Sequence, residues 1–431
     1  MEDKIKKSIR YSTLDGIFAS IMLGLSENFI TPYALAMKAT VSQIGVLASL
    51  PNLIGNVSQL ATASIVDRLG SRMALIKPCV LLHAFMWIPI ILAPYMIPQN
   101  TVACLIAFVA VYAFLSNFDL PAWSSLMADH VPEGKRGSFF GWRNRFLGFI
   151  NFGTALLAGL TLNFFRGSPL LGFTIIFSVA FIARLISWNF LRKMYEPPLV
   201  IKDEHRFTFA QFVRRMKVSN FGRFVIFASC MSFSVNIVSP FFSVYMLNDL
   251  RFDYLSYTVI TLAATLTSLS ATRIWGVHAD SVGTRRVLRL TSAFVPIVPL
   301  LWVLSHNKIY LVMIQVFAGF FWSGFNLCVA NFIFDAVTPE KRTRCIAYFN
   351  AINGSAVCLG ALLGGFLVKY LPPVFGYKIL ALALISVVLR SFSVLLMSRV
   401  KEVRPVNKVS SLELFYSVIG IRPIDQAASK E

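Results

Sequence analysis

Long apolar runs occupy most of this 431-residue chain, and they limit its fold more than any other feature. A hydrocarbon core of about 30 Å is crossed by about 20 apolar residues of α-helix. No water satisfies backbone N–H and C=O groups there, so helices are the default structure for such runs. We identify twelve of them: 12–36, 41–64, 73–94, 101–127, 138–163, 171–192, 223–247, 254–275, 287–305, 309–333, 344–369 and 376–398. The sequence therefore predicts an all-α, polytopic membrane protein.

The composition agrees with this prediction, and the distribution of charge gives an orientation. Hydrophobic residues make up 56% of the chain, whereas soluble domains contain about 45–50%. With the first ten residues taken as cytosolic, the tails and the loops on that side hold 32 of the 40 Lys and Arg. The loops on the other side hold six, namely Lys38, Arg166, Arg251, Lys308, Lys369 and Lys378. This positive-inside bias predicts that both termini are cytosolic, and it explains the net charge of +20 without any binding of nucleic acid.

The second half of the chain repeats the first. Residues 26–33 (SENFITPY) match residues 234–241 (SVNIVSPF) at an offset of 208, and Arg184 matches Arg390 at an offset of 206. A period of half the chain is typical of two six-helix bundles. We therefore assign residues 1–194 to an N-terminal bundle, 195–222 to a cytosolic linker, 223–400 to a C-terminal bundle and 401–431 to a cytosolic tail. The linker mixes aromatic and basic residues, so it contains either an interfacial helix at the membrane surface or a helix packed on the bundle.

Two turns with the same spacing lie at equivalent positions of the two halves. They read Ala63-x-x-x-Asp67-Arg68-x-Gly70-Ser71-Arg72 and Gly276-x-x-x-Asp280-x-x-Gly283-Thr284-Arg285-Arg286, and they are 213 residues apart. Glycine permits backbone angles that other residues avoid, and an aspartate can face the positive N-terminal end of a neighbouring helix. The candidate residues of a cytosolic gate are Asp67, Arg68, Gly70, Arg72, Gly276, Asp280, Gly283, Arg285 and Arg286. The alternative is that these charges only set the topology.

The chain resembles the major facilitator superfamily over about residues 10–400. The resemblance rests on twelve spans in two similar halves, a basic central loop, and Asp-Arg-x-Gly-x-Arg between the second and third spans. It implies that the two turns hold the halves together in the outward-facing state. It also implies that the first and seventh helices line a central cavity and that the sixth and twelfth lie outside it. Three positions depart from the family pattern, since Ala63 replaces a glycine and Met73 and Ser281 replace basic residues.

Glu27 breaks the internal repeat, because its counterpart in the second half is Val235. Next to it, the carbonyl of Asn28 cannot bond to Pro32, which has no amide N–H, so the helix is bent or opened there. Freed backbone groups of this kind suit a binding site near the membrane midplane. We therefore predict that Glu27, Asn28 and the repeat-related Asn236 contact the solute or take part in coupling. The alternative is that Glu27 lies among the lipid headgroups.

Other charges also lie within apolar runs. A charge at the bilayer centre costs roughly 2.5–3.5 kcal/mol even on lenient scales, so it usually faces a cavity or a partner. Asp119 and Arg143 are expected at similar depth on adjacent helices, which predicts a buried ion pair. A role for these two residues with substrate or protons is the alternative. Arg184 and Arg390 are related by the repeat, which predicts a structural role in both halves.

Together these features predict a secondary active transporter that moves a small solute by alternating access. Protons are the expected coupling ion, because Glu27 and Asp119 are carboxylates. The alternatives are a transporter-like sensor or scaffold that does not transport, and a lipid flippase on the same fold. The chain contains no Gly-x-x-x-x-Gly-Lys-Ser/Thr motif and no metal-ligand spacing, so we expect no enzymatic activity, no cofactor and no metal site. We expect a monomer in the cell membrane, with the solute, protons and the lipid bilayer as its partners.

Overall fold

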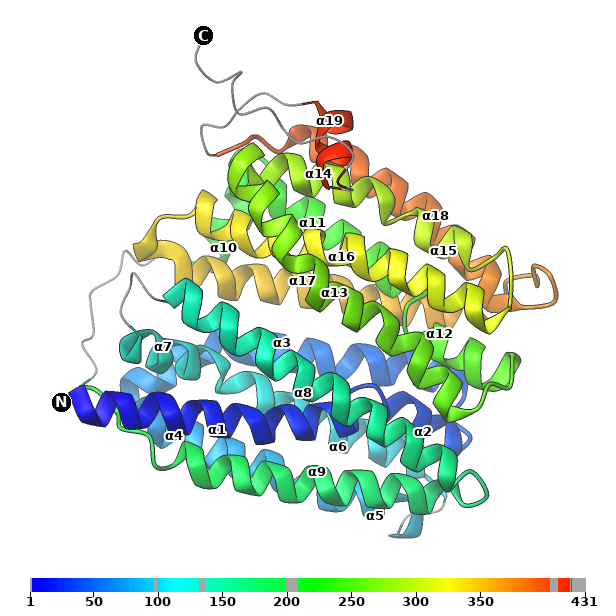
Figure 1. The fold of residues 1–431 in the computed structure, drawn as a ribbon, viewed down its shortest axis with the longest axis horizontal. Coiled ribbons are helices and arrows are strands. Elements are labelled where there is room, and N and C mark those ends of the chain that lie inside the picture. The colour runs from blue at the N-terminus through cyan, green and yellow to red at the C-terminus, as the bar shows by residue number, and fades with distance from the viewer. Residues whose placement is uncertain are drawn as a thin grey trace.

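Helices make up nearly all of the structure, which is a computed structural model describing residues 2–96, 99–131, 136–198, 208–403, 410–418 and 420 (Figure 1). The first half contains α1 (Glu2–Ser26), α2 (Ile30–Ala36), α3 (Val41–Leu69), α4 (Arg72–Phe85), α5 (Trp87–Met96), α6 (Thr101–Phe118), α7 (Leu120–His130), α8 (Arg136–Phe164) and α9 (Pro169–Leu191). The linker contains α10 (Phe209–Arg215). The second half contains α11 (Asn220–Asn236), α12 (Phe241–Val244), the π-helix η2 (Tyr245–Asp249), α13 (Tyr254–Val282), α14 (Thr284–Phe294), α15 (Ile297–Leu301), α16 (Lys308–Ala336), α17 (Pro339–Leu367), α18 (Lys378–Leu396) and the 3₁₀-helix η3 (Met397–Arg399). The tail contains α19 (Ser411–Val418).

Ten helical stretches of the described chain are long and apolar enough to cross a membrane, judged by length and composition. They correspond to ten of the predicted crossings and confirm an all-α, polytopic membrane protein. The first and ninth predicted crossings fall outside this set. The first is divided into α1 and α2 by a break after Ser26, and the ninth is divided into the short helices α14 and α15. The count of twelve spans and the cytosolic location of the termini remain predictions.

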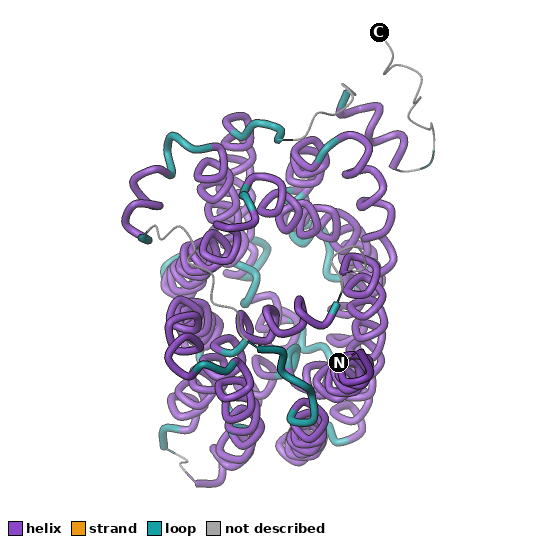
Figure 2. Tube along the Cα trace, turned by 90° about the vertical axis from the view of Figure 1, so that its left-hand side faces the viewer, coloured by secondary structure: helices purple, strands orange, loops and turns teal. Residues whose placement is uncertain are grey.

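The helix packing follows the internal repeat. Figure 1 shows α1–α9 in its lower part and α11–α18 in its upper part, and Figure 2 looks along the helices. In the first half α1 packs against α8 and α9, and in the second half the equivalent α11 packs against α17 and α18. The most extensive contacts between the halves are those of α3 with α17 and of α8 with α13, and α12 also contacts α2 and α3.

Small residues allow α17 to approach its neighbours closely. A Cβ atom at Gly364 would stand 2.0 Å from the carbonyl oxygen of Ile237, at the end of α11. A Cβ atom at Gly45 of α3 would stand 2.9 Å from the carbonyl oxygen of Ala361. Side chains essentially never approach a backbone oxygen so closely. The run of small residues at 360–365 therefore serves close helix packing, both within the second half and between the halves.

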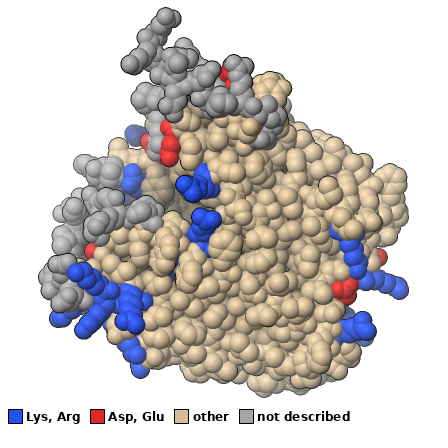
Figure 3. Space-filling model, in the orientation of Figure 1, with Lys and Arg blue, Asp and Glu red and all other residues tan. Residues whose placement is uncertain are grey.

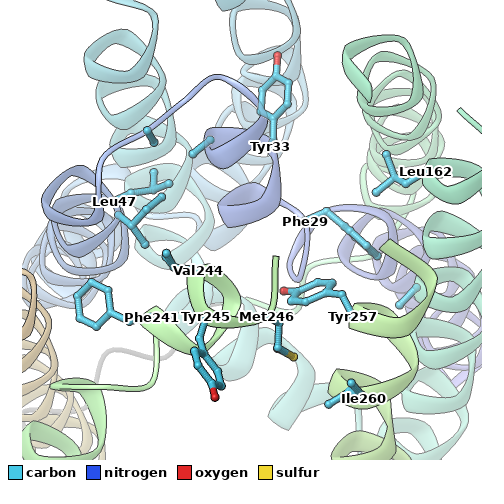
Figure 4. Packing of buried hydrophobic residues seen from close by; sticks show 14 of the residues in the cluster. Phe29, Tyr33, Leu47, Leu162, Phe241, Val244, Tyr245, Met246, Tyr257 and Ile260 are labelled. Atoms are coloured by element: carbon cyan, nitrogen blue, oxygen red, sulfur yellow. The ribbon is translucent and has the colours of Figure 1, made fainter. Parts of the chain in front are cut away.

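An apolar cluster surrounds the breaks in the first and seventh predicted segments (Figure 4). Phe29 and Phe241, which lie in or next to these breaks, are completely buried. Tyr33 is buried as well, and its hydroxyl donates a hydrogen bond to the Ile90 carbonyl oxygen at 3.0 Å. Aromatic rings of this size supply much of the buried apolar area of a core, and a buried tyrosine hydroxyl needs such a partner. The cluster therefore holds both helix breaks in position.

The surface has a wide region without charged side chains (Figure 3). In this view Lys and Arg gather toward the end that carries the N-terminus and, in smaller number, at the opposite end. An uncharged region between two charged ends suits the hydrocarbon core of a bilayer. Together with the ten apolar helical stretches, it identifies an integral, multi-pass membrane protein.

The linker helix α10 packs on the second half. Phe212 is 7% exposed, and the centre of its ring lies 5.8 Å from that of Phe221 and 5.5 Å from that of Tyr348. The Thr208 hydroxyl accepts a hydrogen bond from the Gln211 N–H and caps the start of the helix. This arrangement agrees with the second interpretation of the linker, a helix packed on the bundle.

Candidate functional site

A cavity of about 670 Å³ lies between the two halves. The first half contributes the α1–α2 break and α3, and the second contributes the α11–α12 break, α13, α15, α16 and α18. Its charged and aromatic lining residues are Glu27, Arg390, Phe242, Tyr257, Trp302 and Trp322. The volume falls in the range of roughly 300–1,000 Å³ that is usual for small-molecule sites. This cavity is the candidate solute site.

The three predicted binding residues meet in this cavity. Glu27 and Asn28 enter it from the break between α1, which ends at Ser26, and α2, which begins at Ile30. Asn236 enters it from the end of α11. The structure thus brings residues of both halves together at one site, while their contact with a solute remains a prediction.

A hydrogen bond joins the two halves at the α1–α2 break. The Tyr257 hydroxyl of α13 donates to the carbonyl oxygen of Asn28 at 2.9 Å. In a regular helix this carbonyl would accept from the residue four positions later, but that residue is Pro32, which has no N–H. Tyr257 therefore satisfies the backbone group that the proline leaves free. The free carbonyl is predictable from the sequence, but Tyr257 is not, because no local signal says which distant side chain supplies the donor.

Other contacts join the halves near the same end, opposite the N-terminus. The Ser42 hydroxyl of α3 donates to the Gly365 carbonyl oxygen of α17 at 3.2 Å. The rings of Phe173 in α9 and Tyr254 in α13 lie 5.6 Å apart, edge to face. All of these residues lie close to the ends of their helices. They join the two halves at the end opposite the N-terminus. We call the contacts of Asn28, Ser42, Phe173 and their partners the outer gate, because this end is predicted to face away from the cytosol.

Asp119 and Arg143 do not form the predicted ion pair. Each is 6% exposed, and no ion pair within 4.0 Å joins them in the described part of the chain. The Arg143 guanidinium instead donates to the Ser12 carbonyl oxygen at 3.1 Å and lies 5.0 Å from the ring centre of Trp123. Asp119 lies at the junction of α6 and α7. The prediction of the pair is wrong for this conformation, because similar depth does not decide which way a side chain points around its helix.

A chain of polar contacts connects α1, α4 and α9. The Ser187 hydroxyl donates to Asp15 Oδ1 at 2.6 Å, and Arg184 Nη1 donates to the Ser187 oxygen at 3.1 Å. Arg184 Nε also donates to His83 Nδ1 at 3.1 Å. These contacts hold three helices of the first half together and support the structural role predicted for Arg184.

Arg390, the repeat-related arginine, has different surroundings. It is 3% exposed, and it donates from Nε to the Ser386 hydroxyl at 2.9 Å and from Nη1 to the Val295 carbonyl oxygen at 3.1 Å. It also lines the central cavity. The expectation that the twelfth helix lies outside the cavity is wrong at this residue, since a long arginine side chain extends well beyond its own helix.

The first of the two turns with the same spacing is held within its own half by two carboxylates. Gly70 ends α3 with a φ of 65°, as the turn requires. Arg72 is 1% exposed, and its Nη1 donates to Asp129 Oδ2 at 2.6 Å. Its backbone N–H donates to one oxygen of Glu196 and the Ser71 hydroxyl donates to the other, both at 2.6 Å. This turn is thereby anchored to the ends of α7 and α9.

The second turn is anchored in an equivalent way. Gly283 has a φ of 93° and separates α13 from α14. The Arg285 N–H donates to Glu402 Oε2 at 2.9 Å, and the Thr284 hydroxyl donates to Asp335 Oδ2 at 2.8 Å. Both halves thus use an aspartate and a glutamate to hold the turn, but the side-chain partners differ. The Ser71 hydroxyl donates to the glutamate and the Thr284 hydroxyl to the aspartate, and the Arg285 side chain donates to the carbonyl of the residue at 400.

The two glutamates, Glu196 and Glu402, were not among the residues predicted from the sequence. They are 206 residues apart, which is the same offset that relates Asp129 to Asp335. The repeat itself therefore carried the signal. Both follow a membrane helix and lie in segments assigned to the linker and the tail, where no apolar periodicity indicates that a residue packs on the bundle.

The remaining gate candidates lie nearer the surface. Asp67 and Arg68 are exposed at the end of α3, and the Asp67 carboxylate has no hydrogen-bond or ion-pair partner among the described residues. Asp280 is exposed as well, Arg286 is half-buried, and Gly276 lies inside α13. In this conformation the turns are anchored within each half, and a role in joining the halves remains a prediction.

Comparison with known proteins finds one matching family model and several structures with the same fold. The family model of the Major Facilitator Superfamily matches residues 224–421. No curated protein sequence matches the chain significantly. Several solved structures share its fold, and each is only distantly related in sequence.

The crystal structure of a mutant of the nucleoside transporter NupG has a TM-score of 0.72 at 12% identity, covering 91% of this chain and 100% of that chain. A bacterial homologue of the iron transporter ferroportin, in an inward-facing state, has a TM-score of 0.67 at 13% identity, covering 92% and 98%. The xylose transporter XylE from E. coli, in a partially occluded inward open conformation, has a TM-score of 0.64 at 14% identity, covering 93% and 98%. The solutes in these names differ, so the fold does not select the solute. The model of the Major Facilitator Superfamily thus matches the second half of this chain, and the whole chain shares the fold of these transporters.

Proposed function

We propose that this chain is a secondary active transporter that moves a small solute through the central cavity by alternating access. The observation that carries the proposal is that the breaks of two repeat-related helices face one cavity, with Glu27 and Asn28 from one half and Asn236 from the other. Broken helices at equivalent positions of two repeats are the arrangement in which such transporters bind solute and coupling ion. Either direction, uptake or export, is compatible with it.

We assign the described conformation to the inward-facing part of the cycle. The outer gate is closed, since the Tyr257 hydroxyl bonds to the Asn28 carbonyl and the Ser42 hydroxyl bonds to Gly365. At the opposite end, the exposed Asp67 carboxylate has no partner in the described part of the chain.

Protons are the proposed coupling ion, and Glu27 is the proposed carrier. It is the one carboxylate among the described residues that line the cavity. Its side chain has no hydrogen-bond or ion-pair partner among the described residues. A carboxylate that faces a cavity without a fixed partner can take up a proton on one side and release it on the other. Asp119, which is buried outside the cavity lining, is the second candidate.

The test uses the full chain in proteoliposomes with an imposed pH gradient, a panel of radiolabelled solutes and a trapped pH-sensitive dye. Glu27→Gln keeps the shape of the side chain but removes its titration. We expect this variant to lose accumulation of solute against its gradient while exchange across the membrane persists. The control is Asp249→Asn, an exposed carboxylate outside the cavity lining. Normal accumulation by Glu27→Gln would contradict the coupling role and move the assignment to Asp119.

A further inference from the structure

We propose that Arg390 binds an anionic group of the solute, so that the cavity selects a small organic anion carrying a carboxylate or a phosphate. This inference rests on the proposed function and specifies the chemistry of its solute. Three features of the molecule support it: the geometry of the guanidinium, the internal repeat and the remaining lining of the cavity.

The Arg390 guanidinium is fixed in place with one nitrogen left over. Nε and Nη1 are used by the Ser386 hydroxyl and the Val295 carbonyl. Ser386 in turn donates to the Ser234 carbonyl oxygen at 2.6 Å, which fixes the serine that orients the arginine. Nη2 has no hydrogen-bond partner among the described residues, and it is not one of the fully enclosed polar atoms that lack one. It therefore keeps some accessible surface, and the space beside this residue is the cavity that Arg390 lines.

The charge of Arg390 is not compensated, in contrast to that of Arg184. Arg184 is linked through Ser187 to the Asp15 carboxylate and directly to His83. Arg390 has no carboxylate within 4.0 Å among the described residues. A buried charge without a partner is strongly destabilising, and inside a membrane such a residue marks a pathway or a site.

The internal repeat shows that the second half has other residues at the positions of the partners of Arg184. At the offset of 208 that relates the first and seventh segments, the position of Asp15 corresponds to Arg223. At the offset of 213 that relates the two turns, the position of His83 corresponds to Pro296. Pro296 follows the residue whose carbonyl Arg390 now contacts. A structural arginine would be expected to keep its counterion, whereas a binding arginine must leave that place open for a solute.

The rest of the lining indicates an organic anion with an apolar part. Phe242, Trp302 and Trp322 offer aromatic surface in the same cavity. Glu27 is the other charged residue among the described lining residues, and it forms no ion pair with Arg390. The guanidinium is suited to carboxylate and phosphate groups, because its planar donors match two oxygens at once.

Binding is tested on the purified full chain in nanodiscs at constant ionic strength. The probes are benzoate, phenyl phosphate and the neutral benzamide, and the readouts are thermal stabilisation and quenching of tryptophan fluorescence, since Trp302 and Trp322 line the cavity. We expect at least one of the two anions to bind at least tenfold more tightly than benzamide, a difference of about 1.4 kcal/mol. If neither anion binds more tightly than benzamide, the inference is wrong.

Variants locate the anion site. Arg390→Gln should abolish the preference for the anion, and Arg390→Lys should keep part of it, because lysine retains the charge and loses the paired donors. The control is Arg192→Gln, which removes an exposed arginine at the end of α9. An anion preference that survives in Arg390→Gln would overturn the inference. If Arg390→Gln does not fold, unchanged anion affinity in Arg390→Lys would overturn it instead.

The same proteins separate this inference from the proposed function. Anion binding that depends on Arg390, without any transport in proteoliposomes, would contradict transport and leave the anion site standing. Proton-driven transport of a neutral solute that is unchanged in Arg390→Gln would support transport and contradict the anion site.

Discussion

The hydrogen bond from Tyr257 to the Asn28 carbonyl stabilises the closed outer gate, because it joins α13 to the break between α1 and α2. Tyr257→Phe removes the hydroxyl and keeps the ring, and Tyr257 as a whole is only 3% exposed. A hydrogen bond contributes about 0.5–1.5 kcal/mol net, and an orphaned buried carbonyl costs about 1–3 kcal/mol. In the open gate, water can reach the carbonyl. We therefore expect the closed state to lose about 1–1.5 kcal/mol relative to the open state, a five- to tenfold shift.

Pro32 provides a second variant that tests the cause. Pro32→Ala restores an N–H four residues after Asn28, so the carbonyl can be satisfied within its own helix. Tyr257→Phe should then have less than half its effect in the Pro32→Ala background. An equal effect in both backgrounds would show that the tyrosine acts through something other than this carbonyl.

The measurement is labelling of a single cysteine at Ala48, which lines the cavity, in a chain whose six native cysteines are replaced. A membrane-impermeant maleimide is added from the side opposite the N-terminus, and we expect Tyr257→Phe to be labelled five to ten times faster. Tyr254→Phe is the matched control, because Tyr254 lies one turn earlier on α13, packs on Phe173 and has no hydrogen bond from its hydroxyl to any described residue. Equal labelling rates for Tyr257→Phe and the unmodified chain would refute the reasoning.

Three further predictions concern other parts of the molecule. Arg72→Met should lower the free energy of unfolding by about 2–3 kcal/mol in denaturant titrations, less than for a fully buried pair because the Asp129 side chain is 44% exposed. Gly45→Val should accelerate labelling of the cysteine at Ala48 from the outer side. The valine side chain would enter the contact between α3 and α17 and separate the helices that close the outer gate. Burial raises the pKa of Asp253, but hydrogen bonds at the start of α13 and the nearby Lys308 outweigh this effect and lower the pKa to about 2. Its folded pKa is thus below the unfolded value of about 3.9, so its stabilising contribution is present above pH 4 and is lost as the pH falls toward 2. Melting curves of the protein and of Asp253→Asn should therefore differ at pH 5 and converge near pH 2.

The sequence by itself determines that this is a helical membrane protein of two related halves, because these properties depend on local chemistry. Apolar runs of membrane length can satisfy their backbone only as helices, and a repeated sequence forms repeated elements. The break at Asn28 is also local, since the missing N–H of Pro32 acts within one helical turn. Glu27 lies beside that break, and Asn236 is the counterpart of Asn28 in the repeat. Both could therefore be assigned to the cavity from the sequence.

Only the tertiary structure decides which side chains meet across helices. Arg143 faces α1 and Trp123 rather than Asp119. Arg390 reaches the cavity, although its helix was expected to lie outside it. The donor to the Asn28 carbonyl comes from residue 257, in the other half. The depth of a residue in the membrane follows from counting along the chain, at about 1.5 Å per residue. Its direction around the helix axis, and the neighbour it reaches, depend on how all the helices rotate and tilt when they pack, and no short stretch of sequence contains that information.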